Sequence, residues 1–348
     1  MGKLQLTVDV ERLPFSAPFR IAGFLFEHQD AVVVTLEDGQ HRGRGEACGV
    51  YYLDDNVQQM VAALEARRAA IESGIDRASL QQLLPAGGAR NALDCALWEL
   101  DARRTGKAVW ELAGLNPPRP LVTTFTLGAD EPAVMAAGAR RWADAQALKV
   151  KLTGDRELDI ARVNAVRAAR PEVWLGVDAN QGYTVSRLGL LIHALVEANV
   201  TQLEQPVARG QEAGLANFDS PIPLVADESA LGFADLASLV GRFNMVNIKL
   251  DKCGGLTEGL AMAREARRLG LGVMVGNMMG SSLAMAPSFI VGQLCDVVDL
   301  DGPTFLARDR TPAVTYSQGM IWVDEAVWGR APLSSGGGSA SASRGGRR

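Results

Sequence analysis

The sequence is poor in cysteine and histidine, with four cysteines and three histidines in 348 residues. The cysteines show no CxxC spacing, so neither a disulfide framework nor a zinc site is predicted. Long apolar runs are missing too. The longest, 188–196, is broken by His193 and is much shorter than the roughly 20 residues that cross a bilayer. Residues 1–10 lack a basic segment followed by an apolar core. We therefore expect a cytoplasmic protein without a membrane or targeting segment.

A strong excess of either charge is also missing. The chain carries 35 Lys and Arg against 40 Asp and Glu, a net charge of -5. This mild acidity gives no reason to expect binding to nucleic acid or to an anionic membrane, so a small-molecule partner is favoured. At 348 residues the chain is long enough for a barrel-sized domain and a smaller one.

The first part of the chain shows mixed periodicity. Residues 4–10 alternate apolar and polar side chains, and 31–36 form a second strand-like run that ends at a turn signal. Helical periodicity follows over 57–71, 80–84 and 89–104. These patterns predict an N-terminal α+β capping domain over residues 1–116.

After the Gly- and Pro-rich 114–120, short apolar runs alternate with helical segments about every 25 residues. The predicted strands are 121–127, 147–152, 173–178, 201–204, 223–226, 245–249, 271–275 and 297–300. Such repetition predicts an α/β fold, a (β/α)7-8 barrel of the TIM type over 117–302. A doubly wound open sheet would give the same alternation. Residues 303–332 are expected to pack on the capping domain, and the Gly/Ser/Arg-rich 333–348 to be disordered.

Three acids lie where strands of the predicted barrel end. Asp178, Glu204 and Asp227 are 26 and 23 residues apart, about one βα unit each. A lone acid at a strand end is often only the N-cap of the next helix. Three from neighbouring strands converge, however, and cannot stay ionised together without a cation. Hard oxygen ligands favour Mg²⁺, one ion per subunit.

Lysines end two other predicted strands. Lys149 and Lys151 are two residues apart and so share the inward face of their strand, and Lys249 ends the sixth strand. The second and sixth strands of an eight-stranded ring are opposite each other, so Lys151 and Lys249 would approach a bound carbon from its two faces. With Mg²⁺ on a neighbouring carboxylate, this geometry predicts proton removal and return at that carbon through an enediolate. The basic lysine would then titrate below its usual range.

These motifs resemble the muconate-lactonising subgroup of the enolase superfamily. The matching residues are Lys149-x-Lys151, Asp178-x-Asn180, Glu204, Asp227-Glu228 and Asn247-Ile248-Lys249. Within the subgroup, 299–303 (DLDGP), 84–94 and 249–256 look like the L-Ala-D/L-Glu (dipeptide) epimerases. The resemblance spans nearly the whole chain, to about Trp328. It implies an isomerase that epimerises a dipeptide and, if the substrate is Ala-Glu, a part in recycling cell-wall peptides. We also expect a homo-oligomer.

The resemblance implies roles for further residues. Lys151 and Lys249 would be the acid/base pair, Asp178, Glu204 and Asp227 the metal ligands, and Lys149 would orient the substrate carboxylate. Thr126, Asn277 and Met278 would line the substrate pocket. Asp299 and Asp301 also have a physical interpretation, because two acids on the eighth strand, across the barrel from the metal, can pair with the ammonium group of a dipeptide.

One segment departs from the relatives that use Ala-Glu. Their mobile N-terminal loop supplies a cation for the glutamate side chain, whereas 22–28 here is apolar and partly acidic, with Arg20 nearby. The preferred dipeptide therefore stays open. Alternatives on the same scaffold are a cycloisomerase or an o-succinylbenzoate synthase, neither of which needs Asp299 and Asp301, and a non-catalytic metal-stabilised binding barrel. Mandelate-racemase-like chemistry is disfavoured, because Gly276-Asn277 stands where it needs a histidine.

Overall fold

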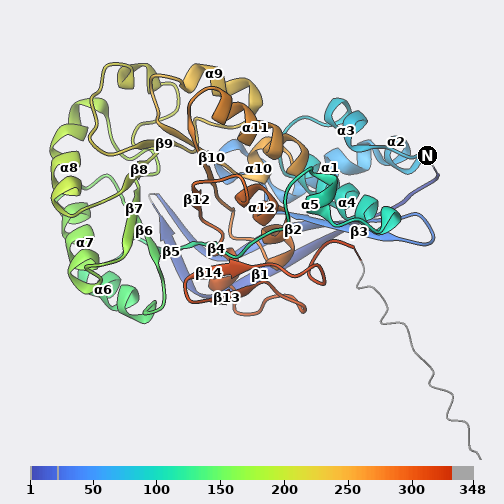
Figure 1. Ribbon diagram of the computed structural model, residues 1–348, viewed down its shortest axis with the longest axis horizontal. Coiled ribbons are helices and arrows are strands. Elements are labelled where there is room, and N and C mark those ends of the chain that lie inside the picture. The colour runs from blue at the N-terminus through green and yellow to red at the C-terminus, as the bar shows by residue number, and fades with distance from the viewer. Residues whose placement is uncertain (1, 22, 331–348) are drawn as a thin grey trace, which may run out of the picture.

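The N-terminal region is an antiparallel sheet with helices packed on one face. The computed structural model describes residues 2–21 and 23–330 (Figure 1). The sheet has the order β1-β2-β3, with β1 (Gln5–Ile21), β2 (Phe24–Glu37) and β3 (Arg42–Ala47). Its helices are η1 (Tyr51–Leu53), α1 (Val57–Ala66), α2 (Arg68–Glu72), α3 (Arg77–Leu83), α4 (Gly88–Thr105) and α5 (Val109–Leu112). The helix predicted over 57–71 is divided, because Arg67 leaves the helical conformation with φ −112°.

Two glycines allow α4 to lie directly on β3. A Cβ at Gly43 would come within 2.0 Å of the carbonyl oxygen of Ala96, and a Cβ at Gly45 equally close to that of Ala92. Only glycine permits this approach of backbone to helix. The apolar faces of β2 and α4 thereby join in one core, which is separate from the core of the barrel.

The larger region is a barrel of parallel strands in sequential order, β5 to β12. The strands are β5 (Thr124–Leu127), β6 (Ala147–Lys151), β7 (Trp174–Asp178), β8 (Gln202–Glu204), β9 (Leu224–Ala226), β10 (Met245–Ile248), β11 (Gly272–Val275) and β12 (Val297–Val298). Between them run α6 (Pro132–Arg141), α7 (Arg156–Ala169), α8 (Val185–Glu197), η2 (Glu212–Leu215), η3 (Phe233–Asp235), α9 (Leu236–Leu239), α10 (Leu250–Cys253), α11 (Leu256–Arg268) and α12 (Ser282–Gly292). The sequential order confirms the predicted barrel, since a doubly wound sheet would reverse its strand order.

The barrel is closed by side chains where its first and last strands meet. Within the described residues no backbone ladder joins β12 to β5. Instead the Thr124 hydroxyl donates to Asp299 Oδ1 at 2.6 Å, and the Thr126 N–H donates to Asp301 Oδ2 at 2.6 Å. The first predicted strand, 121–127, is wrong in its first part. Leu121 and Val122 form β4, which pairs antiparallel with β14 (Met320–Trp322) outside the barrel.

The segment after the barrel contacts both regions. It contains η4 (Gly302–Phe305) and β13 (Thr315–Ser317), and β13 pairs with β14 beside β4. Arg310 forms ion pairs with Glu11 and Glu46 of the N-terminal sheet, and the Trp328 indole N–H donates to the Arg44 carbonyl. Residues 331 and 332 and the tail predicted to be disordered, 333–348, lie outside the described residues.

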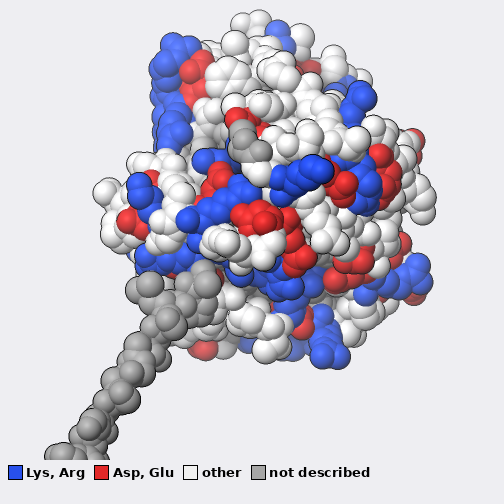
Figure 2. Space-filling model, turned by 90° about the vertical axis from the view of Figure 1, so that its right-hand side faces the viewer, with Lys and Arg blue, Asp and Glu red and all other residues white. Residues whose placement is uncertain are grey.

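The surface carries both signs of charge. On the face drawn in Figure 2, basic and acidic side chains are interspersed. Within residues 2–21 and 23–330, no helix is long and apolar enough to cross a membrane.

Candidate active site

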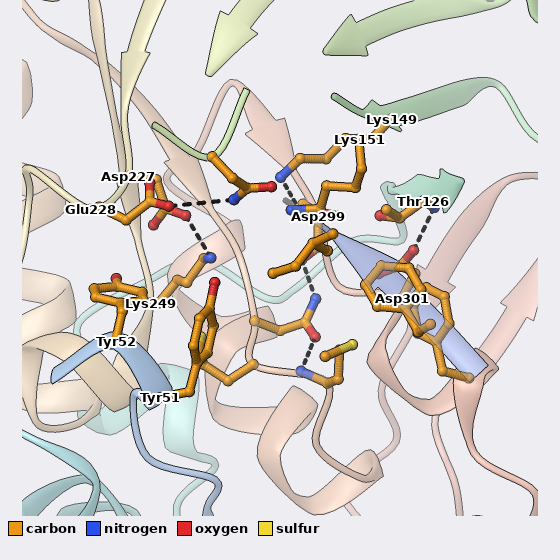
Figure 3. Close-up of a pocket in the computed structure, with 17 residues that line it drawn as sticks. Tyr51, Tyr52, Thr126, Lys149, Lys151, Asp227, Glu228, Lys249, Asp299 and Asp301 are labelled. Atoms are coloured by element: carbon orange, nitrogen blue, oxygen red, sulfur yellow. Dashed lines mark hydrogen bonds and ion pairs between the residues drawn. The ribbon is translucent and has the colours of Figure 1, made fainter. Parts of the chain in front are cut away.

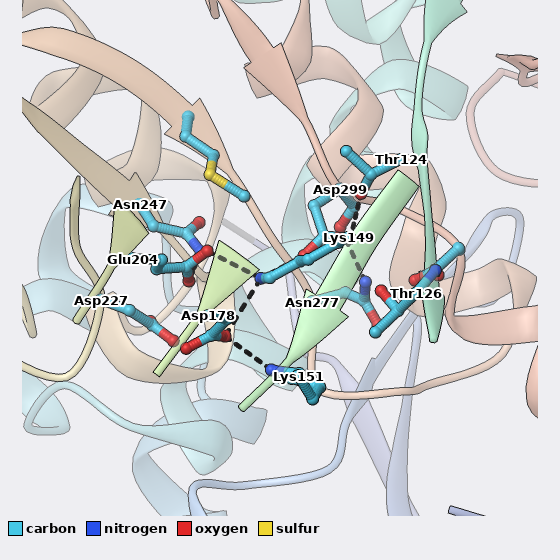
Figure 4. A network of polar contacts seen from close by, with 12 residues as sticks. Thr124, Thr126, Lys149, Lys151, Asp178, Glu204, Asp227, Asn247, Asn277 and Asp299 are labelled. Carbon is cyan, nitrogen blue, oxygen red and sulfur yellow. Dashed lines mark hydrogen bonds and ion pairs between the residues drawn. The ribbon is translucent and has the colours of Figure 1, made fainter. Parts of the chain in front are cut away.

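Three buried carboxylates meet at the carboxyl ends of neighbouring strands. Asp178 ends β7, Glu204 ends β8, and Asp227 follows β9 directly. Each offers an oxygen that lies within 4.8 Å of the other two. All three residues are at most 1% exposed, so solvent screens their mutual repulsion little. The structure therefore brings the three predicted metal ligands to one point (Figure 4).

Three lysines surround these acids. Lys149 and Lys151 project from β6 into the barrel. Val150, between them, points to the opposite face of the strand and packs in the hydrophobic core. Lys149 Nζ lies 2.7 Å from Glu204 Oε2, 3.3 Å from Asp178 Oδ2 and 2.9 Å from Asp299 Oδ2. Lys151 Nζ lies 2.6 Å from Asp178 Oδ2 (Figure 4). On the other side, Lys249 directly follows β10, and its Nζ lies 2.7 Å from Asp227 Oδ2.

The charges in this cluster shift its pKa values in both directions. Burial and the charge of Asp178 raise the pKa of Glu204 to about 7. Burial also acts to raise the pKa of Asp227, but Lys249 and Lys252 outweigh it and hold that pKa below its usual range. Burial would lower the pKa of Lys249, yet Asp227 raises it above the usual value. The sequence predicts a lowered pKa for the basic lysine. The surrounding protein groups alone raise the pKa of Lys249 instead. A divalent cation on Asp227 would oppose this stabilisation of the lysine charge.

The donor set suits a hard cation. Glu204 Oε2 touches Lys149 without hydrogen-bond geometry, and within the described residues the side-chain oxygens Asn247 Oδ1, Asn180 Oδ1 and Glu228 Oε2 are buried without a hydrogen-bond partner. Buried oxygens are normally satisfied, so this group around the carboxylates indicates a cation and its water ligands. Three carboxylate oxygens at this spacing, without a sulfur or imidazole ligand, fit Mg²⁺.

Residues expected to bind substrate line the same pocket (Figure 3). They are Thr126, Lys149, Asn277, Met278, Asp299 and Asp301. The last two differ in their partners. Asp299 is paired with Lys149, which outweighs burial and lowers its pKa. Asp301 has no cationic partner within the described residues, and burial together with the charge of Asp299 raises its pKa to about 7.

Three residues in or beside the pocket are given no role by the sequence analysis. Lys252 is buried, and its Nζ donates to Asp227 Oδ1 at 2.6 Å and to the Asn247 carbonyl at 3.0 Å. It stands three residues after Lys249, and the single turn α10 returns it to the same side, so the spacing was a usable signal. Tyr51 and Tyr52 come from η1 of the capping region, and no local pattern connects them to a barrel site.

The segment compared with the cation-bearing loop is part of a hairpin. The strands β1 and β2 pair as far as Ile21 and Phe24. Phe24 and Phe26 pack against Tyr51, with their ring centroids 4.7 and 5.5 Å from that of Tyr51. Arg20 is exposed.

Residues 4–114 match the family model for the mandelate racemase / muconate lactonizing enzyme N-terminal domain, and residues 134–327 match the enolase C-terminal domain-like model. An L-Ala-D/L-Glu epimerase from Escherichia coli is 40% identical over 89% of this chain and 97% of its own length. An N-acetyl-D-glutamate racemase from a Pseudoalteromonas species is 37% identical over 86% of this chain and 95% of its own length.

Solved structures agree with these matches. An enolase family member from Agrobacterium tumefaciens with homology to dipeptide epimerases, with bound sodium and L-Ala-L-Glu, superposes with a TM-score of 0.90 and 39% identity, over 94% of this chain and all of the other. A dipeptide epimerase from Methylococcus capsulatus, complexed with Mg and L-Arg-D-Lys, gives a TM-score of 0.87 and 30% identity, over 93% and 98% of the two chains.

Proposed function

Because this chain belongs to the mandelate racemase / muconate lactonizing enzyme family of enolase-like proteins, we propose that it is a Mg²⁺-dependent dipeptide epimerase. The observation that carries the proposal is one pocket with two lysines on different sides and three carboxylates between them. The relative from Escherichia coli, an L-Ala-D/L-Glu epimerase, supports it.

Lys151 and Lys249 are the proposed acid/base pair. Their strands β6 and β10 are separated by β7, β8 and β9, so the two ammonium groups reach the pocket from opposed sides (Figure 3). One lysine takes the proton from the α-carbon next to the substrate carboxylate, and the other returns a proton to the opposite face. The configuration at that carbon is inverted as a result.

Asp178, Glu204 and Asp227 would hold Mg²⁺, one ion per subunit. When bound, the ion takes up the negative charge that grows on the substrate carboxylate as the α-proton leaves. Lys149, already within 3.3 Å of two of these acids, would then orient the same carboxylate. Lys252 keeps Asp227 in place through contacts to its side chain and its carbonyl.

Asp301 is the better placed of the two acids to pair with the ammonium group of a dipeptide, because no lysine or arginine among residues 2–21 and 23–330 pairs with it, whereas Asp299 is engaged by Lys149. Thr126 fixes Asp301 through its backbone N–H, and Asn277 donates to the Asp299 carbonyl at 2.7 Å. Asn277 and Met278 line the pocket beside these acids.

A second candidate is racemisation of an N-acylated amino acid by the same lysines. The engagement of Asp299 by Thr124 and Lys149 favours it, since one of the two acids is then part of the barrel seam. The N-acetyl-D-glutamate racemase among the relatives supports it as well.

The deciding experiment is incubation in D₂O with a panel of dipeptides and their N-acetylated forms. Deuterium uptake at each α-carbon is read by mass spectrometry. Exchange at the C-terminal residue of free dipeptides supports the epimerase, exchange in acylated forms alone supports the second candidate, and no exchange in either contradicts both.

Two broader assignments complete the proposal. A cytoplasmic location is supported by four cysteines that all stay free thiols. A homo-oligomeric state remains a prediction, which sedimentation velocity tests directly.

A further inference from the structure

The pocket has a charged lining and an apolar lining. Its charged lining is formed by the lysines and acids at the strand ends. Its apolar lining, called the apolar wall below, consists of Phe19, Ile21, Tyr51, Met278, Met279 and Phe305, which pack in one cluster. These residues come from the N-terminal hairpin, from η1, from the loop after β11 and from η4, so four distant segments contribute side chains to one apolar cluster.

The hairpin directs its arginine away from this wall. Phe19 and Ile21 are each 6% exposed, whereas Arg20 between them is exposed. Successive side chains of a strand point to opposite faces, so Arg20 cannot share the surface of its neighbours. It lines a neighbouring hollow with Leu25 and Arg141, which lies behind Phe19 and Phe305 and shares these two residues with the pocket. Within the described residues, no arginine lines the pocket that holds the lysines.

The cations that do line the pocket are already engaged. Lys151 is paired with Asp178, Lys249 with Asp227, and Lys149 with two of the metal-binding acids and Asp299. A carboxylate on the substrate side chain would have to compete with these acids or be buried unpaired, and an unpaired buried charge is strongly unfavourable. An apolar side chain meets no such penalty and gains from burial.

A second layer of rings backs the wall. Phe24 and Phe26 stack against each other at 6.0 Å and both meet Tyr51 edge-on. Within the wall itself, Phe19 packs against Phe305 with ring centroids 4.7 Å apart.

We infer that the residue whose α-carbon is epimerised carries an apolar side chain, which packs on the apolar wall, so that the enzyme prefers hydrophobic dipeptides to Ala-Glu. This inference rests on the proposed epimerase function. It assigns the wall to substrate selection and leaves the charged lining to the chemistry.

The test compares side chains of similar length but different polarity. Initial rates of α-proton exchange in D₂O are measured for L-Ala-L-Met, L-Ala-L-Gln and L-Ala-L-Glu. We expect kcat/KM to fall in that order, with Met favoured over Glu by at least about tenfold, a modest value for an apolar contact against an unpaired carboxylate. A kcat/KM for Ala-Glu equal to or above that for Ala-Met overturns the inference and leaves the epimerase function intact. If no dipeptide exchanges, the epimerase function fails and the inference fails with it.

A variant sharpens the test. Phe24 is 47% exposed and touches Tyr51, so Phe24→Arg places a cation at the rim of the wall without opening the core. We expect the Met/Glu ratio to fall by about tenfold. The matched control is Val10→Arg, which adds the same charge at a site 56% exposed on the same hairpin, and its ratio should equal that of the wild type. An unchanged ratio in Phe24→Arg, with its fold verified by circular dichroism, counts against the wall as the selecting surface. The wild-type comparison stands without either variant.

Discussion

The charged and the apolar parts of the site differ in where their residues come from. The charged floor, which we define as the lining residues Lys149, Lys151, Asp227 and Lys249 with the adjoining acids Asp178 and Glu204, belongs entirely to the carboxyl-terminal parts of the barrel strands. Half of the apolar wall, Phe19, Ile21 and Tyr51, belongs to the capping region. In the proposed function, the chemistry would reside on parallel strands, whereas half of the surface that selects the substrate would reside on a second structural unit. The cap can therefore change its side chains without disturbing the lysines and acids.

The largest effect is expected from loss of the cation, because the whole floor depends on it. Removal of divalent ions with EDTA should abolish α-proton exchange, and added Mg²⁺ should restore it. Glu204→Gln should weaken Mg²⁺ binding, measured by titration calorimetry, and remove most activity. Mg²⁺ at 100 times its Kd should stabilise the wild type by about 2.7 kcal/mol in thermal unfolding, and the variant by less. Glu197→Gln, 70% exposed, is the control. Undiminished exchange after exhaustive chelation would contradict the metal assignment.

Next come the lysines, whose replacement separates the two sides of the floor. Lys151→Ala and Lys249→Ala should each lower the rate of epimerisation by about 10²- to 10⁴-fold, the usual contribution of a general acid or base. In D₂O each variant should lose exchange mainly from one epimer, and the two variants from opposite epimers. Lys107→Ala removes an exposed lysine outside the pocket as a control. Equal loss from both epimers in both variants would speak against opposed roles.

The sequence allowed the floor to be predicted, because each of its residues follows a local rule. Lys149 and Lys151 share a face through the two-residue strand period, and the three acids recur at the length of a βα unit. The wall follows no such rule. Tyr51 meets Met278 and Phe305 only through folding, across more than 200 residues of sequence. The barrel seam was hidden for the same reason, since Thr124 and Asp299 are 175 residues apart.

A smaller effect is expected at Asp301, the proposed partner of the substrate's ammonium group. Asp301→Asn should lower kcat/KM for a free dipeptide by roughly tenfold to more than a hundredfold, the value of a charge-assisted hydrogen bond of about 1.5 to 3 kcal/mol. The N-acetylated dipeptide should be affected little. Asp299→Asn should impair both substrates, because it removes a partner of Lys149. If the wild type uses both substrates equally well, Asp301 does not recognise an ammonium group.

The pH dependence follows from the same carboxyl group. Burial and Asp299 raise the pKa of Asp301 to about 7. Only the ionised form attracts an ammonium group, so kcat/KM for the free dipeptide should rise as the pH increases through about 7. The N-acetylated substrate has no ammonium group. With that substrate, the ratio of the wild-type rate to the Asp301→Asn rate should not change as the pH rises through about 7. A step of equal size for both substrates would assign the titration to another group.

The smallest effect on turnover, and a clear one on stability, is expected at Asp251, which joins the barrel to the cap. Asp251 lies two residues after Lys249, and its Oδ1 accepts hydrogen bonds from the backbone N–H groups of Cys48 and Gly49 at 2.8 and 3.0 Å, at the start of the loop that carries Tyr51.

Burial raises the pKa of Asp251 to about 7, although these two N–H groups oppose the shift. The folded state therefore retains a proton that the unfolded state, with a pKa near 3.8, has lost. The resulting stabilisation is complete below about pH 4 and is lost as the pH rises through about 7. One pKa unit corresponds to about 1.4 kcal/mol, so a rise of about three units is worth about 4 kcal/mol. Asp251→Asn keeps an acceptor oxygen but cannot titrate. The free energy of unfolding of the wild type, measured by urea denaturation, should fall relative to that of the variant between pH 4 and 8, while kcat at neutral pH changes little. Parallel curves for the two proteins across this range would show that Asp251 is ionised in the folded state as it is in the unfolded one, and that the cap is held to the barrel by an ordinary charged carboxylate.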